Sequence, residues 1–343
     1  METPTSSTSS SRRRGWTAAG VFALLGAGLL AMLGGVGRYL EGDAFIDRRV
    51  AALGAVESGQ AVIAGGSVSR HIELSALCIE GTNLWEPHQD IFEIAALQRH
   101  LEGRGVVPSL WILGYVPGLT TIDKGADGAR GAERRAVAYR TLHAAGDYRL
   151  IGGDWEGALR SVAAPVLGYP EWRGRIRAAV RGDAFDMERP APDRPELDPA
   201  ILEEQARKRA EEARAEQEKM RYHDDGIAGR AMAEILAMNS ALLRQGSRLV
   251  LVEMPVTAQF QALGYGMTPK DLAREERLID RLEKEGATVV RLEDLPDQPA
   301  TRFRDFIHLA RSAGFAFTRE LGAELARREL MEKPACAATQ AGS

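Results

Sequence analysis

Four short apolar segments, each ended by glycine, proline or charged residues, constrain the fold of this chain more than any other feature. They are "AVIAGG" from residue 61, "LWILGYVPG" from residue 110, "RLVLVEMP" from residue 248 and "ATVVRLEDL" from residue 287. Helical patterns are expected over residues 91–103, 228–246 and 269–286, with one more helix near the C-terminus. Buried strands that alternate with helices indicate a parallel sheet with crossovers. We therefore predict an α/β fold with a three-layer doubly wound parallel sheet of at least four strands, in which ligands bind beyond the carboxyl ends of the strands.

The N-terminal region predicts export from the cytoplasm. Three arginines, Arg12, Arg13 and Arg14, precede an uncharged and mostly apolar run over residues 15–37. A helix of about 20 such residues crosses the hydrocarbon layer of a membrane. Because arginines stay on the cytoplasmic side, we expect a cytoplasmic tail (1–14), a transmembrane anchor, and an extracytoplasmic remainder that is periplasmic or at the cell surface. A cleaved signal peptide is the alternative, and it would also export the chain.

Composition excludes several partner classes. The 44 basic residues are interspersed with 48 acidic ones for a net charge of -4, which gives no electrostatic footprint for nucleic acid. The two cysteines, Cys78 and Cys336, lie far apart, so we expect neither a disulfide framework nor a zinc site. The run "YHDDG" around His223 has no second ligand cluster at a suitable spacing, and we interpret it as a polar helix junction. No metal or diffusible cofactor is expected.

The exported part is predicted to be one domain with an insert. Residues 44–182 form its first part, residues 183–225 a linker with a charged helical insert, residues 226–330 its second part, and residues 331–343 a disordered tail. The helix over residues 201–220 has strong helix formers but almost no apolar stripe, so we expect it to be solvated or projecting. Two interpretations stay open for this helix, a salt-bridged solvent face and a lid or partner-binding arm.

Ser67 is the first candidate for chemistry. It follows the first predicted strand, where a ligand should bind, and a helix is expected to begin beyond it. Serine also caps helices routinely, so the position alone does not make it a nucleophile. His308 and Asp305 follow the last predicted strand, and an imidazole with an orienting carboxylate is what a nucleophilic serine requires. For His71, four residues after Ser67, we favour a surface position over a place in the pocket.

In combination, these segments resemble the first and last sequence blocks of the SGNH (GDSL-like) hydrolases. The segments concerned are "AGGSVS" after the first strand and "DFIHL" before the final helix. With its N-terminal span, the chain is similar to membrane-anchored SGNH-like proteins of envelope polymer acylation, such as those of alginate O-acetylation. The resemblance covers residues 61–119 and 246–325. It implies an SGNH-like, flavodoxin-like fold with Ser67 as nucleophile, His308 as general base and acid, and Asp305 as orienting carboxylate.

The same resemblance implies an oxyanion hole. The backbone N–H of Ser67 would form part of it, Gly81 would donate a second N–H, and Asn83 is a nearby side-chain donor. Two positions depart from the family pattern. Gly66 replaces the usual aspartate, and no asparagine follows Gly114, where the family's third block places one. The second departure leaves transferase activity, slow hydrolysis and loss of activity open.

Two functions follow as expectations. The first is a membrane-tethered extracytoplasmic serine acyltransferase or esterase that acts on O-acyl groups of a cell-envelope or exported polysaccharide. The resemblance implies a membrane O-acyltransferase as a possible partner. The second is a non-catalytic SGNH-like scaffold or polymer-binding protein of an envelope assembly complex, with the charged helix over residues 201–220 as its contact surface. The presence of Ser67, Asp305 and His308 favours the enzyme.

Overall fold

The computed structural model describes a sheet domain but little of the N-terminal region. Residues 46–158 and 189–343 belong to one compact unit, while residues 1–45 and 159–188 belong to another. Within the described part of the chain, no helix is both long and apolar enough to span a lipid bilayer. The expected anchor over residues 15–37 lies outside the described residues except at three positions. The described residues are 26, 28–29, 44–118, 128–159, 161, 198–220 and 225–331.

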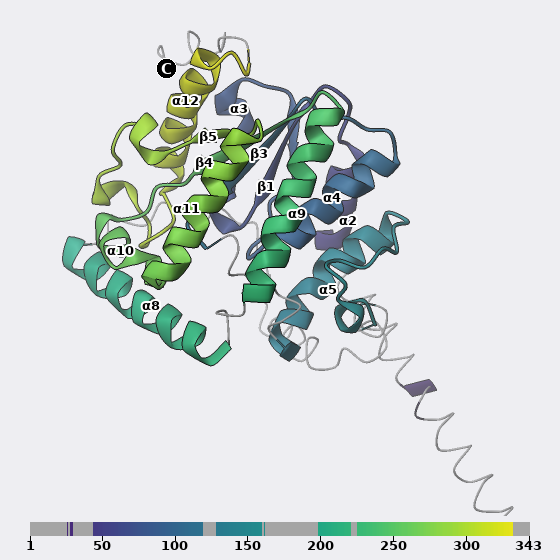
Figure 1. Cartoon of the computed structure of the whole chain (residues 1–343), viewed down its shortest axis with the longest axis horizontal. Coiled ribbons are helices and arrows are strands. Elements are labelled where there is room, and N and C mark those ends of the chain that lie inside the picture. Colours follow the sequence, from purple (N-terminus) through teal and green to yellow (C-terminus); the bar gives the residue numbers. More distant parts are fainter. Residues whose placement is uncertain are drawn as a thin grey trace, which may run out of the picture. The chain divides into compact units, whose positions relative to one another are not determined.

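The sheet has five strands, all parallel, in the order β2-β1-β3-β4-β5 (Figure 1). This architecture is α/β, as predicted, and it is compatible with a doubly wound fold. Because β3 pairs with β4, both predicted parts of the domain build one sheet. The strand order reverses between β1 and β3, which is where ligands bind in such sheets. The strands are β1 (Ala61–Gly65), β2 (Gly81–Asn83), β3 (Leu110–Tyr115), β4 (Arg248–Glu253) and β5 (Thr288–Val290).

Helices connect the strands and cover both faces of the sheet. The helices over residues 91–103, 199–220, 225–244 and 269–284 lie close to their predicted ranges, and several short turns lie at the sheet edge. They are α2 (Ala44–Gly54), η1 (Ser67–His71), α3 (Leu74–Leu77), α4 (Ile91–Gly103), α5 (Gly128–Ala144), α8 (Pro199–Met220), α9 (Asp225–Arg244), α10 (Ala258–Ala262), η3 (Gly264–Gly266), α11 (Pro269–Lys284), η4 (Leu292–Asp294), η5 (Ala300–Arg302) and α12 (Arg311–Arg327).

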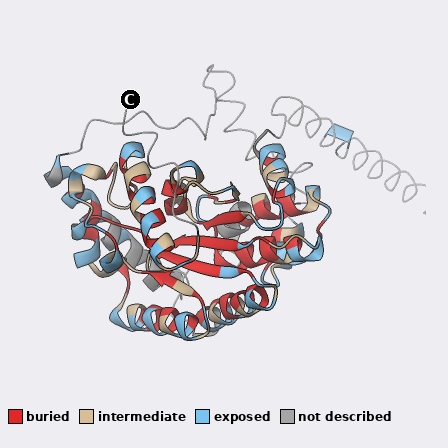
Figure 2. Cartoon of the chain, turned by 90° about the horizontal axis from the view of Figure 1, so that it is seen from above, coloured by how far each residue is buried: buried red, intermediate tan, exposed pale blue. Residues whose placement is uncertain are grey.

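Two apolar clusters hold the sheet between its helices. Side chains alternate along a strand, so Val62 and Ala64 face one side of β1 while Ile63 faces the other. The first cluster packs the sheet against α2, α4, α5, α9 and α11, and the second packs it against η1, α3 and α12. Figure 2 shows the buried strands in the middle and the exposed sides of the flanking helices outside. Strands buried on both faces explain why the predicted segments are continuously apolar.

Three local predictions differ from the structure. Residues 81–83 form a strand that was not expected, because three half-buried residues are too short a segment to show a pattern. The helix expected after Ser67 is only the short 3-10 helix η1, followed by α3. The glycine- and charge-rich run over residues 120–135 predicts a loop, but residues 128–135 begin α5. Buried contacts further along α5, such as the hydrogen bond from the Ile151 N–H to the Tyr139 hydroxyl, stabilise the helix in spite of these glycines and charges.

Helix α8 is docked on the domain through its N-terminal half. Leu202 and Ala206 are fully buried, and α8 contacts α10, η3 and η5. Figure 1 shows α8 running beside α10. Between these two positions Glu203, Glu204 and Gln205 are exposed, so a solvated outer face is correct for this part of the helix. A freely projecting helix is wrong, because a stripe of only two apolar residues is enough to anchor it.

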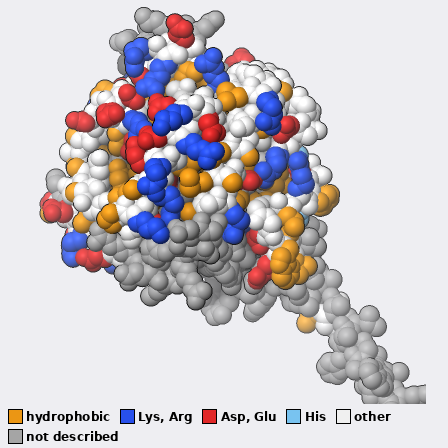
Figure 3. Space-filling view, in the orientation of Figure 1, with side chains coloured by type: hydrophobic (Ala, Val, Ile, Leu, Met, Phe, Trp, Pro, Cys, Tyr) orange, Lys and Arg blue, Asp and Glu red, His pale blue; other side chains and the backbone are white. Residues whose placement is uncertain are grey.

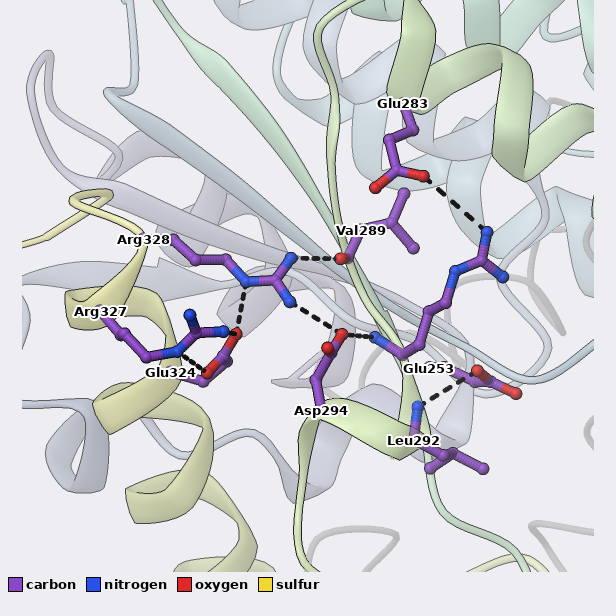
Figure 4. Close-up of polar contacts among 9 residues, drawn as sticks. Glu253, Glu283, Val289, Leu292, Asp294, Glu324, Arg327 and Arg328 are labelled. Carbon is purple, nitrogen blue, oxygen red and sulfur yellow. Dashed lines mark hydrogen bonds and ion pairs between the residues drawn. The ribbon is translucent and has the colours of Figure 1, made fainter.

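The connection between β5 and α12 is fixed by a polar network. Arg328, at the end of α12, donates to the Val289 carbonyl at 2.5 Å and forms an ion pair with Asp294 at 2.8 Å (Figure 4). The Leu292 N–H donates to Glu253 at the end of β4, at 3.3 Å. These contacts tie the start of the connection to the sheet and to α12. The segment that carries Asp305 and His308 therefore begins at a position that these contacts hold in place.

Charged side chains of both signs share the surface. On the face that carries α11, Figure 3 shows acidic and basic groups interspersed. Arg291, for example, pairs with Glu276 at 2.7 Å and with Asp280 at 3.0 Å. Exposed pairs of this kind contribute about 1 kcal/mol or less each to stability.

Cys78 corrects one expectation from composition. It follows α3 in a left-handed backbone conformation with φ of 60°, and it is disulfide-bonded. The prediction that the chain has no disulfide framework is therefore wrong at this position. Cys336, the other cysteine of the sequence, lies outside the described residues. Disulfides persist mainly in oxidising compartments, so this bond is relevant to where the protein works.

Candidate active site

The turn that carries Ser67 requires glycine at one position. Strand β1 ends at Gly65, whose φ is +120°. A Cβ atom there would lie 2.2 Å from the Ser69 Oγ and 2.8 Å from the Gly114 carbonyl oxygen. Ser69 is fully buried and donates a hydrogen bond from its Oγ to that carbonyl at 3.0 Å. Ser69 therefore fixes η1 against β3, and Gly65 leaves the space for it.

Buried polar contacts hold the same turn from the other side. The Gly65 N–H donates to the Gln89 Oε1 at 2.7 Å, and the Gln89 Nε2 donates to the Leu84 carbonyl at 3.1 Å. The Glu86 N–H donates to the Gly65 carbonyl at 3.1 Å. Both backbone groups of Gly65 are thus satisfied, as buried backbone requires. Ser67 follows a turn that is fixed on both sides.

Asp305 organises the loop that carries His308. Phe303 and Leu309 form an antiparallel bridge, and the Arg304 N–H donates to the His308 carbonyl at 2.8 Å. Inside this tight loop, the Asp305 Oδ1 accepts hydrogen bonds from the N–H groups of Ile307 and His308 at 3.0 and 2.8 Å. Aspartate favours turns because its side chain bonds to the backbone two or three residues later. The sequence Asp-x-x-His thereby forms a turn that also aligns the two side chains.

Ser67, His308 and Asp305 form one chain of hydrogen bonds. The His308 Nε2 lies 2.9 Å from the Ser67 Oγ, and the His308 Nδ1 lies 2.9 Å from the Asp305 Oδ2. When Nδ1 donates its proton to the carboxylate, Nε2 is left to accept the serine proton. A nucleophile, a base and an orienting carboxylate in this geometry can perform acyl transfer.

The carboxyl group of Asp305 is held in its ionised form. Burial opposes ionisation, but the hydrogen bond from His308 and those from the two backbone N–H groups outweigh it and lower the pKa of Asp305 to about 2. The ionised Asp305 carboxylate therefore accepts hydrogen bonds throughout the neutral pH range. That charge state fixes the imidazole tautomer that a general base at Nε2 requires.

His71 lies inside the site and not on the surface, so the favoured prediction for it is wrong. Its side chain is buried, and its ring centroid is 5.8 Å from that of His308. Burial, together with the charge of Arg70, lowers the pKa of His71 to about 3. The ring is therefore neutral near pH 7, and its Nε2 accepts a long hydrogen bond from the Arg70 Nε at 3.5 Å.

Gly81 does not lie near Ser67, which corrects its expected role in an oxyanion hole. It pairs with Ala61 at the start of β1, whereas Ser67 follows the end of that strand. The end of β1 at Gly65 lies four residues beyond Ala61, or about 13 Å along the strand. A Cβ atom on Gly81 would lie 2.3 Å from the Ala61 carbonyl oxygen, so close strand packing accounts for this glycine.

Asn83 lies closer to the carboxyl edge, and only the acceptor oxygen of its side chain has a local partner. It pairs with Ile63 in the sheet, and its Oδ1 accepts the Trp85 N–H at 3.1 Å. Among the described residues, no hydrogen bond joins Asn83 to Ser67. The structure thus brings Ser67, Asp305 and His308 together and places Gly81 at the other end of β1, while the Asn83 Nδ2 is the side-chain group that could donate to an oxyanion.

Two arginines near the triad were not identified from the sequence. Arg70 lies on η1 three residues after Ser67, and Arg304 directly precedes Asp305. Both side chains are partly exposed. The available signal was the spacing of Arg70, because side chains three residues apart in a 3-10 helix lie on the same side.

An apolar cluster links α8 to the loop of His308. Ala206 packs with Val256 and Phe260, and this cluster extends to Phe306 and Ile307. Phe306 and Ile307 lie between Asp305 and His308 in the sequence. The docked half of α8 thus packs in the same cluster as the loop that presents the base.

Comparisons with known proteins identify no relative: no protein-family model matches the chain, and no curated protein matches it. The described residues contain no group of three or more His, Cys, Asp or Glu side chains that could hold a metal ion. His223 lies outside the described residues. The functional argument therefore depends on the geometry of the site.

Proposed function

We propose that this protein is an SGNH-like serine acyltransferase or esterase that acts on O-acyl groups of a cell-envelope or exported polysaccharide. The observation that carries the proposal is the hydrogen-bond chain from Ser67 through His308 to Asp305 at the carboxyl edge of a parallel sheet. Support also comes from its placement, because the nucleophile follows the first strand and the base precedes the last helix. The strand order 2-1-3-4-5 is that of flavodoxin-like sheets.

The reaction has two balanced steps. In the first, the Ser67 Oγ attacks the acyl carbonyl carbon while the His308 Nε2 takes its proton; the bond from that carbon to the alcohol oxygen then breaks, and His308 returns the proton to the alcohol. In the second, a sugar hydroxyl or water gives its proton to His308 and attacks the acyl-enzyme, and Ser67 leaves with that proton. Asp305 stays ionised and stabilises the imidazolium that forms in each step.

An oxyanion forms in both steps and needs hydrogen-bond donors. The Ser67 N–H opens η1, and the first N–H groups of a helix have no partner inside it. We assign this N–H to the oxyanion hole, as the family resemblance implies. In another enzyme, removal of one such donor costs about 3 to 4 kcal/mol of transition-state stabilisation. With Gly81 removed from the group, the side-chain amide of Asn83 stays the proposed second donor.

We further propose that the sheet domain is extracytoplasmic and tethered by the segment over residues 15–37. The arginines that precede this segment and its apolar length support the orientation. The disulfide at Cys78 is independent support, because cytosolic proteins rarely keep structural disulfides. A membrane O-acyltransferase remains the partner that the resemblance implies.

A second candidate function is a non-catalytic scaffold that binds polymer or an assembly complex. The observation that favours it is the position of Gly81 at the far end of β1 from Ser67, which removes one of the donors expected for an oxyanion. Its contact surface would be the exposed side of α8, where Glu204 and Arg207 form an ion pair. A scaffold has no requirement for the serine, histidine and aspartate to be aligned.

Acetyl-ester turnover separates these functions. The full-length chain is incubated with p-nitrophenyl acetate, with and without an oligosaccharide acceptor, and both free acetate and acetylated sugar are measured. An esterase releases acetate in either case, whereas a transferase forms acetylated sugar at the expense of acetate. Ser67→Ala should abolish both, while Ser109→Ala, at the opposite edge of the sheet, should not. A folded wild-type chain without either product supports the scaffold.

A further inference from the structure

Exposed apolar side chains gather in one short segment that follows α5. In the described part of the chain, seven large apolar side chains are strongly exposed, and four of them lie within residues 148–159. Three of these four belong to the unit that contains the sheet: Tyr148 is 74% exposed, Leu150 50% and Trp155 67%. We call these three residues the apolar stripe. Single exposed apolar residues are ordinary on a protein surface, whereas a group of them indicates an interaction site.

Contacts with two helices hold the backbone of this segment in place. The Arg149 Nη2 donates to the Arg99 carbonyl in α4 at 2.9 Å. The Ile151 N–H donates to the Tyr139 hydroxyl of α5 at 2.9 Å, and the Ile151 side chain is fully buried. The segment therefore presents the exposed side chains of the stripe from a fixed backbone.

Trp155 lies at the N-terminal end of α4. The carboxylate of its neighbour Asp154 is 3.8 Å from the Arg135 Nη1. Arg135 also forms a buried ion pair with Asp90, which is the N-cap of α4. These contacts place the end of the stripe beside the first turn of α4.

Helix α2 begins near the same end of α4. In its second turn, Arg49 pairs with Glu86 at 3.1 Å and donates to the Trp85 carbonyl at 3.0 Å. Glu86 precedes the N-cap of α4 by four residues. The N-terminal half of α2 and Trp155 are thus both attached around the start of α4.

The proposed anchor brings this end of the domain to the membrane. The apolar run ends at residue 37 and α2 begins at Ala44, so residues 38–43 form the connection. Six residues span at most about 22 Å when fully extended. The start of α2 is therefore held close to the lipid headgroups, and so is the end of the stripe that lies beside α4.

We propose that the apolar stripe lies in the interfacial layer of the bilayer that anchors the chain. This inference rests on the proposed tether over residues 15–37. Contact at the tether and at the stripe limits the rotation of the domain. The carboxyl edge of the sheet, which carries Ser67, is thereby held at a defined height above the membrane.

The composition of the stripe fits the interfacial layer. Tryptophan and tyrosine favour this layer because one end of each side chain is apolar and the other forms hydrogen bonds. The charges nearby do not favour anionic lipid: Arg149 pairs with Asp147 at 2.6 Å, and Glu156 follows Trp155. We therefore expect the stripe to bind a zwitterionic bilayer through apolar contact.

Tryptophan quenching by lipid tests this contact. The full-length chain is reconstituted into phosphatidylcholine vesicles with and without bromine atoms near the top of the acyl chains, which quench tryptophan fluorescence on contact. The contribution of Trp155 is the difference between the wild type and Trp155→Phe. We expect brominated lipid to remove most of this contribution. Leu150→Asp, which adds a charge to the stripe, should restore much of it.

Ile201→Trp on the Trp155→Phe background is the matched control. Ile201 is 47% exposed, but it lies on α8, which is on the other side of the domain from α5 (Figure 1). The new tryptophan should keep its fluorescence in brominated vesicles. Circular dichroism confirms that each variant is folded.

The same vesicles separate the stripe from the tether. Trp16 lies at the start of the apolar run, and Trp16→Phe gives its contribution in the same way. If Trp16 is quenched and Trp155 is not, the tether holds and the stripe proposal is overturned; a blue shift of Trp155 emission with rising chain-to-lipid ratio would then assign the stripe to a second copy of the chain. If neither is quenched, the tether itself fails. Equal quenching of Trp155 and of the tryptophan at position 201 also overturns the stripe. Catalysis is tested separately, through the reactivity of Ser67.

Discussion

The Nε2 of His308 lies 2.9 Å from the Oγ of Ser67, although 241 residues separate them in the sequence. Ser67 follows β1, whereas His308 follows β5, which lies three strands away, or about 14 Å across the sheet. The connection from β5 returns across the carboxyl edge to close this gap. The Thr257 N–H, just beyond β4, donates to the Phe306 carbonyl at 3.0 Å and fixes the crossing segment.

The two glycines before Ser67 should respond differently to substitution. Gly65→Ala places a Cβ atom against Ser69 and the Gly114 carbonyl at positive φ, so we expect it to destabilise the fold by about 2 kcal/mol or more. Gly66→Ala meets no atom within 4 Å at a φ of -71° and should stay within about 0.5 kcal/mol of wild type. Urea unfolding measures both. Equal stability of the two variants would contradict the proposed packing of the nucleophile turn.

Docking of α8 can be tested at two adjacent residues. Leu202 is fully buried while Ile201 is 47% exposed. Leu202→Ala should cost about 2 to 3 kcal/mol and make α8 more sensitive to limited proteolysis, because a buried leucine is truncated. Ile201→Ala should cost well under 1 kcal/mol. If both variants are digested at the wild-type rate, α8 is not docked as described.

His71 predicts a specific pH dependence of stability. Its pKa is about 3 in the folded chain, against 6.5 for the ordinary imidazole, so the unfolded chain takes up a proton first as pH falls. Protonation therefore favours unfolding from about pH 6.5 down to about pH 3, and costs up to about 1.4 kcal/mol per pH unit.

Replacing His71 by glutamine should make the free energy of unfolding depend less on pH. Between pH 8 and pH 5, the wild type should lose about 2 kcal/mol more unfolding free energy than His71→Gln. Chemical denaturation at several pH values gives the two curves. Parallel curves would mean that His71 titrates normally in the folded chain, and hence that it is not buried.

Much of the architecture could be predicted from the sequence. Segments such as those at Val62 and Leu249 are continuously apolar because they are buried on both faces, and this pattern alone predicts parallel strands between helices. The same rule places residues that follow each strand at one edge. Ser67 and His308 were therefore expected near each other, although the pattern does not give the distance between them.

The remaining features depend on contacts between distant segments. Gly81 was assigned to the oxyanion hole from its place in a family block. Its position is decided by the register of its strand, which pairs it with Ala61. A strand of three residues shows no sequence pattern from which this register could be predicted. His71 looks like a surface residue until α12 covers it, where Thr318 bonds to its carbonyl oxygen at 2.8 Å. The docking of α8 depends on two apolar residues, too few to form a periodic pattern.

Labelling with a serine-reactive fluorophosphonate tests the central claim most directly. We predict a covalent adduct on Ser67 in the full-length chain, located by mass spectrometry, which is absent in Ser67→Ala and forms about a thousandfold more slowly in His308→Ala. Circular dichroism confirms that each variant is folded. A folded wild-type chain that forms no adduct at Ser67, or a His308→Ala chain that reacts at the wild-type rate, would contradict a nucleophile activated by this histidine.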